Sequence, residues 1–242
     1  MYLPRQFTAT DMAQIAAFVD AAATATLVTF DGSKPVATLL PVIWDRPESL
    51  TAGPESAGTG EADGPDEYGH LLGHIAIAND QWRTAVPDAQ ALAIVTGSQA
   101  YISPAWYESK ARHGRVVPTW NYEVVHLTGH VTFRHAADWL RGLVTALTLR
   151  HEAGRDHPWA VSDAPREYID GQLRAIVGVE LAITSIEPKQ KLSQNRGEPD
   201  RAGVVAGLRA EPGAGPAAIA DLMAAQLAGG GREDAANPAM EV

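Results

Sequence analysis

The segment that decides the fold is Tyr101-Ile102-Ser103-Pro104-Ala105-Trp106-Tyr107, followed by Val117-Pro118-Thr119-Trp120-Asn121-Tyr122 and then Val125-His126. It carries five large aromatic residues within 22 positions, in a chain whose aromatic content is 7% overall. Most of these rings stand beside polar or turn-forming residues, a mixture that suits a flat conjugated ligand. The alternative is a core cluster, although Asn121 would need hydrogen-bonding partners there.

Strand-like runs flank this segment, and the order of the other elements favours a barrel. Six short strands of antiparallel type, with helices at the periphery, indicate a mainly β (α+β) protein rather than a doubly wound sheet. There is no GxGxxG and no P-loop. We expect strands over 25–30, 36–44, 71–78, 91–102, 124–134 and 178–186, and helices over 8–22, 136–151, 164–176, 199–209 and 216–227.

Composition restricts the class of protein further. The chain of 242 residues is 45% hydrophobic, which allows a large core, and it lacks cysteine, which excludes disulfides and thiolate chemistry. No apolar run is long enough to span a membrane, and the N-terminus lacks the apolar core of a signal peptide, so we expect a cytoplasmic protein. The net charge of −10 makes direct DNA binding an unfavourable hypothesis.

The segment from Gly73 to Trp82 joins the end of a strand to the start of a short helix. Free N–H groups at such a helix start can bind an anion such as a phosphate, and His74, Asn79 and Gln81 add further donors. The alternative interpretation is a helix capped by Asn79 or Asp80 beside a buried histidine.

The segment from Lys189 to Arg196 is almost entirely polar and follows the last expected strand. Its hydrogen-bonding side chains could hold a phosphate or the carbonyl groups of a ring, and the alternative is an ordinary polar loop.

Two histidine pairs, His70/His74 and His126/His130, have i, i+4 spacing, which places each pair on one face of a strand. Neither pair has an evident third ligand, so we expect no metal site. There is also no GxSxG motif. No residue stands out as a catalytic acid or base, and whether the protein is an enzyme stays open.

These segments together resemble the PaiB-type family, described as FMN-binding negative transcriptional regulators. The resemblance covers residues 1–208 in family order, and its most specific strings are Val117-Pro118-Thr119-Trp120-Asn121-Tyr122 and Lys191-Leu192-Ser193-Gln194-Asn195-Arg196. It implies a split β-barrel of the FMN-binding type, related to pyridoxamine-phosphate-oxidase-like flavoproteins. In that fold FMN usually lies at a homodimer interface with residues from both subunits.

Carried over by position, the resemblance implies four groups of cofactor-binding residues. Near the phosphate and ribityl end it places His74, Ala76, Asn79 and Trp82; on the barrel wall, Tyr101 and Ser103; near the isoalloxazine, Thr119, Trp120 and Asn121; and closing the site, Lys191, Ser193, Gln194 and Arg196. Ile77 and Asp80 depart from the family pattern, which more often has a basic or polar residue and a proline there. The departures weaken a phosphate site, so haem or another flavin is the alternative cofactor.

The predicted organisation is a split-barrel domain over 1–210, with a flexible acidic insertion at 48–69, and an Ala/Gly-rich, partly disordered tail over 211–242. A flavin-binding protein with redox capability is the leading hypothesis. A regulator that acts indirectly is the second, and a haem-binding protein ligated by His74, His126 or His130 is the third. A homodimer is expected because a split barrel leaves an apolar, aromatic-rich edge to be covered.

Overall fold

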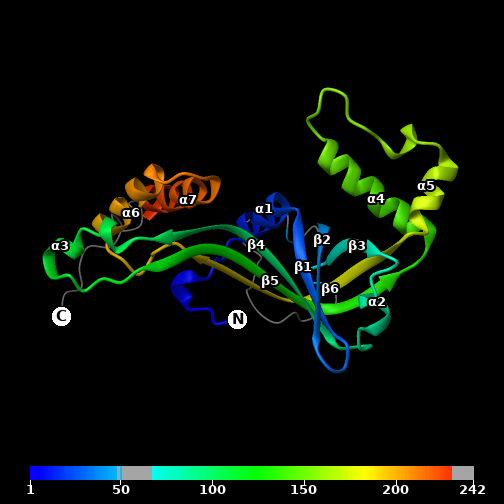
Figure 1. Ribbon diagram of the computed structural model, residues 1–242, viewed down its shortest axis with the longest axis horizontal. Helices are drawn as coiled ribbons and strands as arrows, with labels where there is room; N and C mark the ends of the chain where they lie inside the picture. Colours follow the sequence, from blue (N-terminus) through cyan, green and yellow to red (C-terminus); the bar gives the residue numbers. More distant parts are fainter. Residues whose placement is uncertain (48–49, 51–66, 231–242) are drawn as a thin grey trace. The chain divides into compact units, whose positions relative to one another are not determined.

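The computed structural model describes residues 1–47, residue 50 and residues 67–230. Within these residues the strands form a closed barrel in the order β1-β2-β3-β6-β5-β4, which confirms the expected barrel (Figure 1). Antiparallel pairing joins β1 to β2 and β4, and β3 to β2 and β6. The strands are β1 Thr24–Phe30, β2 Pro35–Asp45, β3 His70–Ala76, β4 Gln90–Ile102, β5 Thr119–Arg134 and β6 Ile176–Lys191.

Local sequence explains how the barrel closes. The β1–β2 hairpin turns at Asp31, whose carboxylate accepts the backbone N–H groups of Ser33 and Lys34, and at Gly32, whose φ is +91°. Hydrogen bonds from the Ser33 hydroxyl and from the backbone N–H groups of Lys34 and Ser33 hold the pKa of Asp31 below its ordinary value. Gly129 allows β5 to approach β6, because a Cβ there would lie 1.9 Å from the carbonyl oxygen of Ala182.

Helices and short 3-10 turns connect the strands. They are η1 Arg5–Phe7, α1 Met12–Ala22, α2 Gln81–Thr84, η3 Pro104–Trp106, α3 Ser109–His113, α4 Ala137–Glu152, η4 Val161–Asp163, α5 Arg166–Leu173, α6 Glu198–Ala210 and α7 Ala214–Gly230. The helix expected over 8–22 begins later than predicted, at Met12, since the Asp11 carboxylate caps α1 by accepting from the N–H groups of Ala13 and Gln14. None of the described helices has the length and apolar character needed to cross a membrane.

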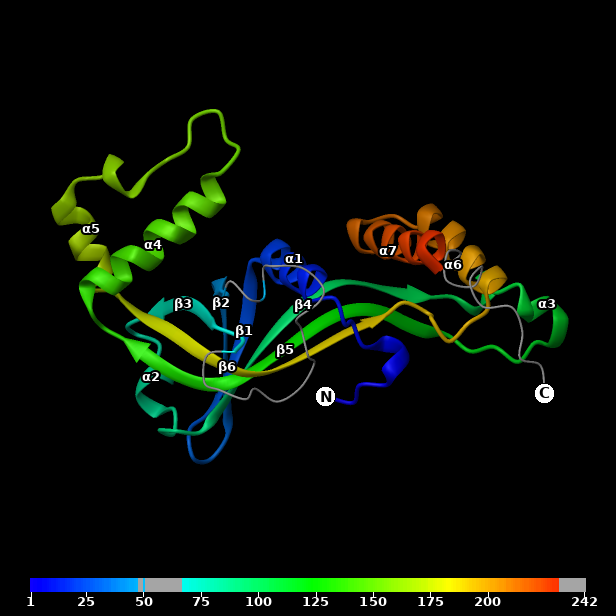
Figure 2. The same ribbon diagram turned by 180° about the vertical axis from the view of Figure 1, so that it is seen from behind.

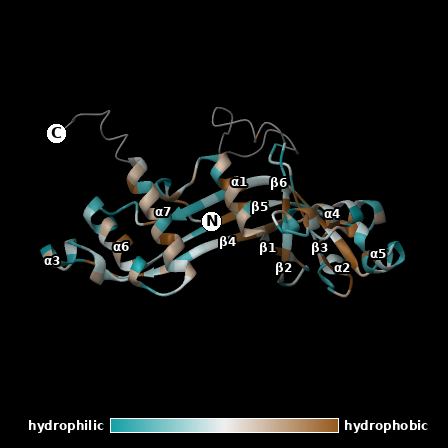
Figure 3. Cartoon of the chain, turned by 90° about the horizontal axis from the view of Figure 1, so that it is seen from above, coloured by the Kyte–Doolittle hydropathy of each residue, from teal (hydrophilic) through white to brown (hydrophobic). Residues whose placement is uncertain are grey.

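The chain divides into two compact units. Unit 1 comprises residues 1–9, 97–124 and 188–242, and unit 2 comprises residues 10–96 and 125–187. The three long strands β4, β5 and β6 each contribute residues to both units. Along β5 polar and apolar residues are mixed, whereas α3 is hydrophilic (Figure 3).

In unit 1, α6 and α7 lie side by side (Figure 2). Their buried residues Leu208, Ile219 and Met223 share one core with Ile102 and Tyr107. The helix expected over 216–227 lies within α7, so this part of the Ala/Gly-rich sequence after residue 211 packs as a helix up to Gly230. The rest of that expected tail, and nearly all of the expected insertion at 48–69, lie outside the described residues.

In unit 2, α4 and α5 form a helical pair that packs on its own small core of Leu140, Ile169 and Leu173. Arg141 of α4 donates to Asp170 of α5 and so ties the two helices together. The helix expected over 164–176 ends at Leu173, because β6 already begins at Ile176.

Candidate functional site

The predicted site residues fall into two groups, one in each unit. In unit 1, Thr119, Trp120 and Asn121 begin β5, and Lys191 ends β6. The Lys191 ammonium donates to the Thr119 hydroxyl and, at 2.7 Å, to the Trp120 carbonyl. The structure thus brings the two most specific strings of the sequence together. The strand expected over 178–186 is longer in the structure, since β6 runs from Ile176 through Lys191.

Two aromatic rings accompany this cation. The rings of Tyr101 and Trp120 meet edge to face, with centroids 6.2 Å apart, and the two residues are 49% and 45% exposed. The Trp120 indole N–H donates to the Gln99 side chain at 3.0 Å, which fixes the ring. Large rings held in place but left half exposed are typical of ligand or partner contacts.

The neighbouring Lys189 is already committed inside unit 1. It is buried, donates to the Tyr2 carbonyl at 2.8 Å, and has the rings of Tyr2 and Tyr122 each 5.6 Å from its ammonium. Burial, together with repulsion from the Lys189 charge, holds the pKa of Lys191 below its ordinary value. Lys191 is therefore a cation that would gain from an anionic or carbonyl partner.

Several predicted residues have their polar groups engaged within unit 1. Asn121 is completely buried, and its amide exchanges hydrogen bonds with the Ser193 hydroxyl and donates to the Met223 sulfur. Gln194 accepts from the Leu192 N–H and donates to the Gln190 carbonyl. The Ser103 hydroxyl caps η3. These side chains shape the unit, and their part in ligand contact stays a prediction.

Arg196 also belongs to unit 1. Its guanidinium lies 4.8 Å above the Tyr107 ring. Asp200 accepts from the backbone and hydroxyl of Ser109 at 2.8 and 2.7 Å. Burial opposes the charge of Asp200, but these hydrogen bonds and the nearby Arg196 and Arg112 outweigh it, so its pKa lies below the ordinary value.

In unit 2, His74 and Ala76 lie on β3. The Nδ1 atom of His74 is buried and has no hydrogen-bond partner, and desolvation by burial lowers the pKa of its imidazole. His74 is therefore neutral at pH 7 and offers hydrogen bonds rather than charge. It lines a pocket of about 270 Å³ with His151 and Trp159.

The turn between β3 and α2 is locked by its amide side chains. Asn79 accepts from the Gln81 N–H at 3.0 Å and donates to the Thr38 hydroxyl at 2.8 Å. The bond from the Gln81 N–H to Asn79 lies at the start of α2, as the alternative interpretation of this segment expected. The helix α2 has only four residues. The Trp82 indole N–H donates to the Ile77 carbonyl, and the ring lies between His135 and the Arg83 guanidinium.

Sequence reasoning did not assign a structural role to Gln81. Its side chain is 1% exposed, and Nε2 faces the Leu27 carbonyl, the Thr29 hydroxyl and the Val36 carbonyl at 3.1 to 3.2 Å. It fixes α2, and with it Asn79 and Trp82, against β1 and β2. Its sequence neighbours are Asp80 and Trp82, and nothing in them marks Gln81 as buried.

Among residues 1–47, 50 and 67–230, no cluster of three or more His, Asp or Glu side chains could hold a metal ion.

The closed antiparallel barrel, with half-exposed rings beside a lysine, defines a split-barrel protein of the flavin-binding class. The family described as "Putative FMN-binding domain" matches residues 1–185, and the chain belongs to this family. A Bacillus subtilis relative, protease synthase and sporulation protein PAI 2, is 31% identical over 94% of this chain and 98% of its own. The chain is thus a flavin-binding protein of the PaiB type.

Solved structures share the fold at low sequence identity. The FAD and heme binding protein from Mycobacterium smegmatis matches with a TM-score of 0.51 and 19% identity, over 81% of this chain and 78% of its own. The flavocytochrome Anf3 from Azotobacter vinelandii matches with a TM-score of 0.50 and 14% identity, over 83% and 78%.

The residues present fit the cofactor of this family. FMN needs a face for its ring system, a donor for its carbonyl edge and donors for a phosphate. The Tyr101 and Trp120 rings beside the Lys191 ammonium meet the first two needs. The orphaned Nδ1 of His74 is an unsatisfied polar atom within the segment predicted for the phosphate end.

Proposed function

We propose that the unit 1 group binds the isoalloxazine ring of FMN. Trp120 and Tyr101 would cover the ring, and the Lys191 ammonium would donate to its carbonyl edge. The observation that carries the proposal is the pair of half-exposed rings held in edge contact beside a cation whose pKa is depressed. Thr119 and the Trp120 carbonyl keep this ammonium in place.

The unit 2 group is proposed for the phosphate and ribityl end. His74 would act as a neutral hydrogen-bonding group, and Trp82 would add an apolar face. Asn79 acts as a positioning residue, because its amide is already bonded to Thr38 and Gln81. Arg196, the remaining cation of the predicted set, is the proposed group that closes the ring end.

FMN, when bound, supplies reversible electron and hydride transfer. The contribution of the chain is to bind and orient the ring and to set the charge at its edge. The Lys191 ammonium, which donates to the Thr119 hydroxyl and the Trp120 carbonyl, would stabilise negative charge at the ring edge. A flavin-dependent redox activity is the proposed consequence.

Titration of the purified protein with FMN, followed by quenching of flavin fluorescence, tests the proposal. Trp120→Ala should weaken FMN binding about tenfold or more, because stacking on an aromatic ring contributes about 1–3 kcal/mol. Tyr168→Ala is the control: Tyr168 is an aromatic residue that is 59% exposed, and it belongs to no group proposed for the flavin. Equal losses in both variants, or no quenching in the unmodified protein, would refute the assignment.

The proposal includes a cytoplasmic homodimer that regulates without binding DNA directly. The exposed Trp120, Tyr101 and Val117 of unit 1 supply apolar surface that a second copy could cover. The net charge of −10 opposes direct contact with DNA. Light scattering that gives a monomer, or salt-sensitive binding of the protein to promoter DNA, would contradict these two parts.

Haem is the alternative cofactor. His74 has a buried Nδ1 atom without a hydrogen-bond partner, and its neutral imidazole is the form that ligates iron. Addition of haemin should then give a Soret band that His74→Gln removes while His130→Gln leaves it unchanged.

A further inference from the structure

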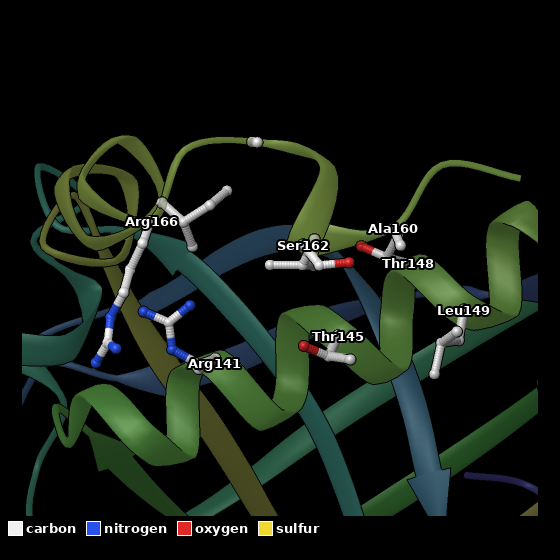
Figure 4. A pocket seen from close by; sticks show the side chains of 10 residues that line it. Arg141, Thr145, Thr148, Leu149, Ala160, Ser162 and Arg166 are labelled. Carbon is white, nitrogen blue, oxygen red and sulfur yellow. The ribbon is translucent and has the colours of Figure 1, made fainter.

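A second pocket lies wholly within unit 2, between α4, η4 and α5, with a volume of about 480 Å³ (Figure 4). This volume is within the range of about 300–1,000 Å³ that is usual for small-molecule sites. None of the residues proposed for the flavin lines it.

One face of α4 supplies most of the polar lining. Arg141, Thr145 and Thr148 follow one another at spacings of four and three residues, so they lie along one stripe of the helix. The opposite stripe, with Leu140, Leu143 and Leu147, is buried. The hydroxyl of Ser162 comes from η4, across the pocket from α4 (Figure 4).

The charge at one end of the pocket is positive. Arg141 and Arg166 both point into this end (Figure 4), and both interact with Asp170: Arg141 donates to its Oδ1, and Arg166 lies 3.9 Å from its Oδ2. Two guanidinium groups and one carboxylate leave one net positive charge. Each guanidinium has five N–H donors, and each makes only one contact with Asp170.

The remaining lining is aliphatic. It includes Leu149, Val161 and Ile169, and no aromatic residue lines the pocket. Leu149 is 62% exposed, which leaves apolar surface at the pocket that no described residue covers. The pocket therefore combines two arginine side chains, hydroxyl groups and an aliphatic wall, and lacks the ring faces that a flavin would need.

We propose that this pocket binds a short aliphatic carboxylate. Arg141, which is half-buried and oriented by Asp170, would pair with the carboxylate. Arg166 would add a second charge contact, and Thr145 and Ser162 would bond the remaining oxygen lone pairs. The alkyl chain would lie against Leu149, Val161 and Ile169. The aliphatic wall favours a carboxylate that carries an alkyl chain over an inorganic anion, which has no apolar part.

Ligand-observed NMR with hexanoate, hexanamide and inorganic phosphate as probes tests this site. Hexanoate should bind saturably, and hexanamide, which has the same chain without the charge, should bind about tenfold more weakly or worse. Phosphate should not displace hexanoate. Absence of saturable hexanoate binding, equal affinity for hexanamide, or efficient displacement by phosphate would each overturn the proposal.

Variants locate the binding. Arg141→Gln should weaken hexanoate binding about tenfold. Arg141 also joins α4 to α5, so its replacement could disturb the fold, and Arg166→Gln provides a second test. The Arg166 side chain is 89% exposed, and its replacement leaves the Arg141–Asp170 pair intact. Hexanoate binding to this variant should weaken several-fold. Arg209→Gln, which removes an exposed arginine of unit 1, is the matched control and should leave hexanoate binding unchanged. Affinity for FMN should be the same in all three variants, so this proposal and the flavin proposal fail separately. Unchanged hexanoate binding in both pocket variants would overturn the assignment.

Discussion

Replacement of Gln81 by glutamate should destabilise the protein in a pH-dependent way. The orientation of the Gln81 amide is settled by its neighbours, since Nε2 faces three acceptors, while Oε1 is buried without a partner. Gln81→Glu keeps the shape but replaces the NH₂ group with oxygen. An ionised carboxylate would face two backbone carbonyls in a site that is 1% exposed. The carboxyl is therefore expected to stay protonated in the folded protein, where its O–H still donates one hydrogen bond.

The magnitude follows from linkage. In the unfolded chain the new carboxyl ionises with a pKa of about 4.3, whereas its pKa in the folded protein is raised above 7. The unfolded state therefore loses a proton that the folded state keeps, and stability falls by about 1.4 kcal/mol for each pH unit above 4.3. At pH 7 this amounts to about 3.7 kcal/mol, with about 1 kcal/mol more for the lost second donor.

Urea unfolding of the two proteins between pH 4 and pH 7 measures this difference. Gln14→Glu, at an exposed position of α1, is the control and should change stability by less than about 0.5 kcal/mol at every pH. Parallel stability curves for Gln81→Glu and the unmodified protein, or a loss below about 1 kcal/mol at pH 7, would refute the reasoning.

The remaining predictions concern one histidine and two glycines. His74 has a folded-state pKa below its unfolded value of about 6.5, so the stability that it contributes is present above that pH and is lost as the pH falls toward its folded pKa. Its imidazole resonances should titrate below pH 6.5 by NMR, and a midpoint at or above 6.5 would contradict the burial argument. Gly203→Ala should destabilise the protein by about 1–3 kcal/mol, because the new Cβ would lie 2.1 Å from the Trp106 carbonyl oxygen. Gly142→Ala, where nothing lies within 4 Å on the exposed side of α4, should instead stabilise it by about 0.5–1 kcal/mol, and thermal unfolding that ranks the two variants the other way would count against this packing.

Sequence alone determined the barrel, because strand alternation, hairpin turns and helix periodicity are local properties. The strand expected over 124–134 is an example, since it lies within β5. Sequence also selected Trp120, Tyr101 and Lys191, since rings and cations beside turn residues are visible in the chain itself.

Only the tertiary structure decided which polar side chains are engaged. Asn121 and Ser193 are 72 positions apart and are hydrogen-bonded to each other inside unit 1. Asn79 donates to Thr38 on β2, which is 41 positions away. A hydrogen-bond partner far along the chain leaves no local mark, so sequence could not separate these structural amides from ligand-binding ones. The pocket between α4 and α5 arose in the same way, because Arg141 and Arg166 come together only through the Asp170 that both contact.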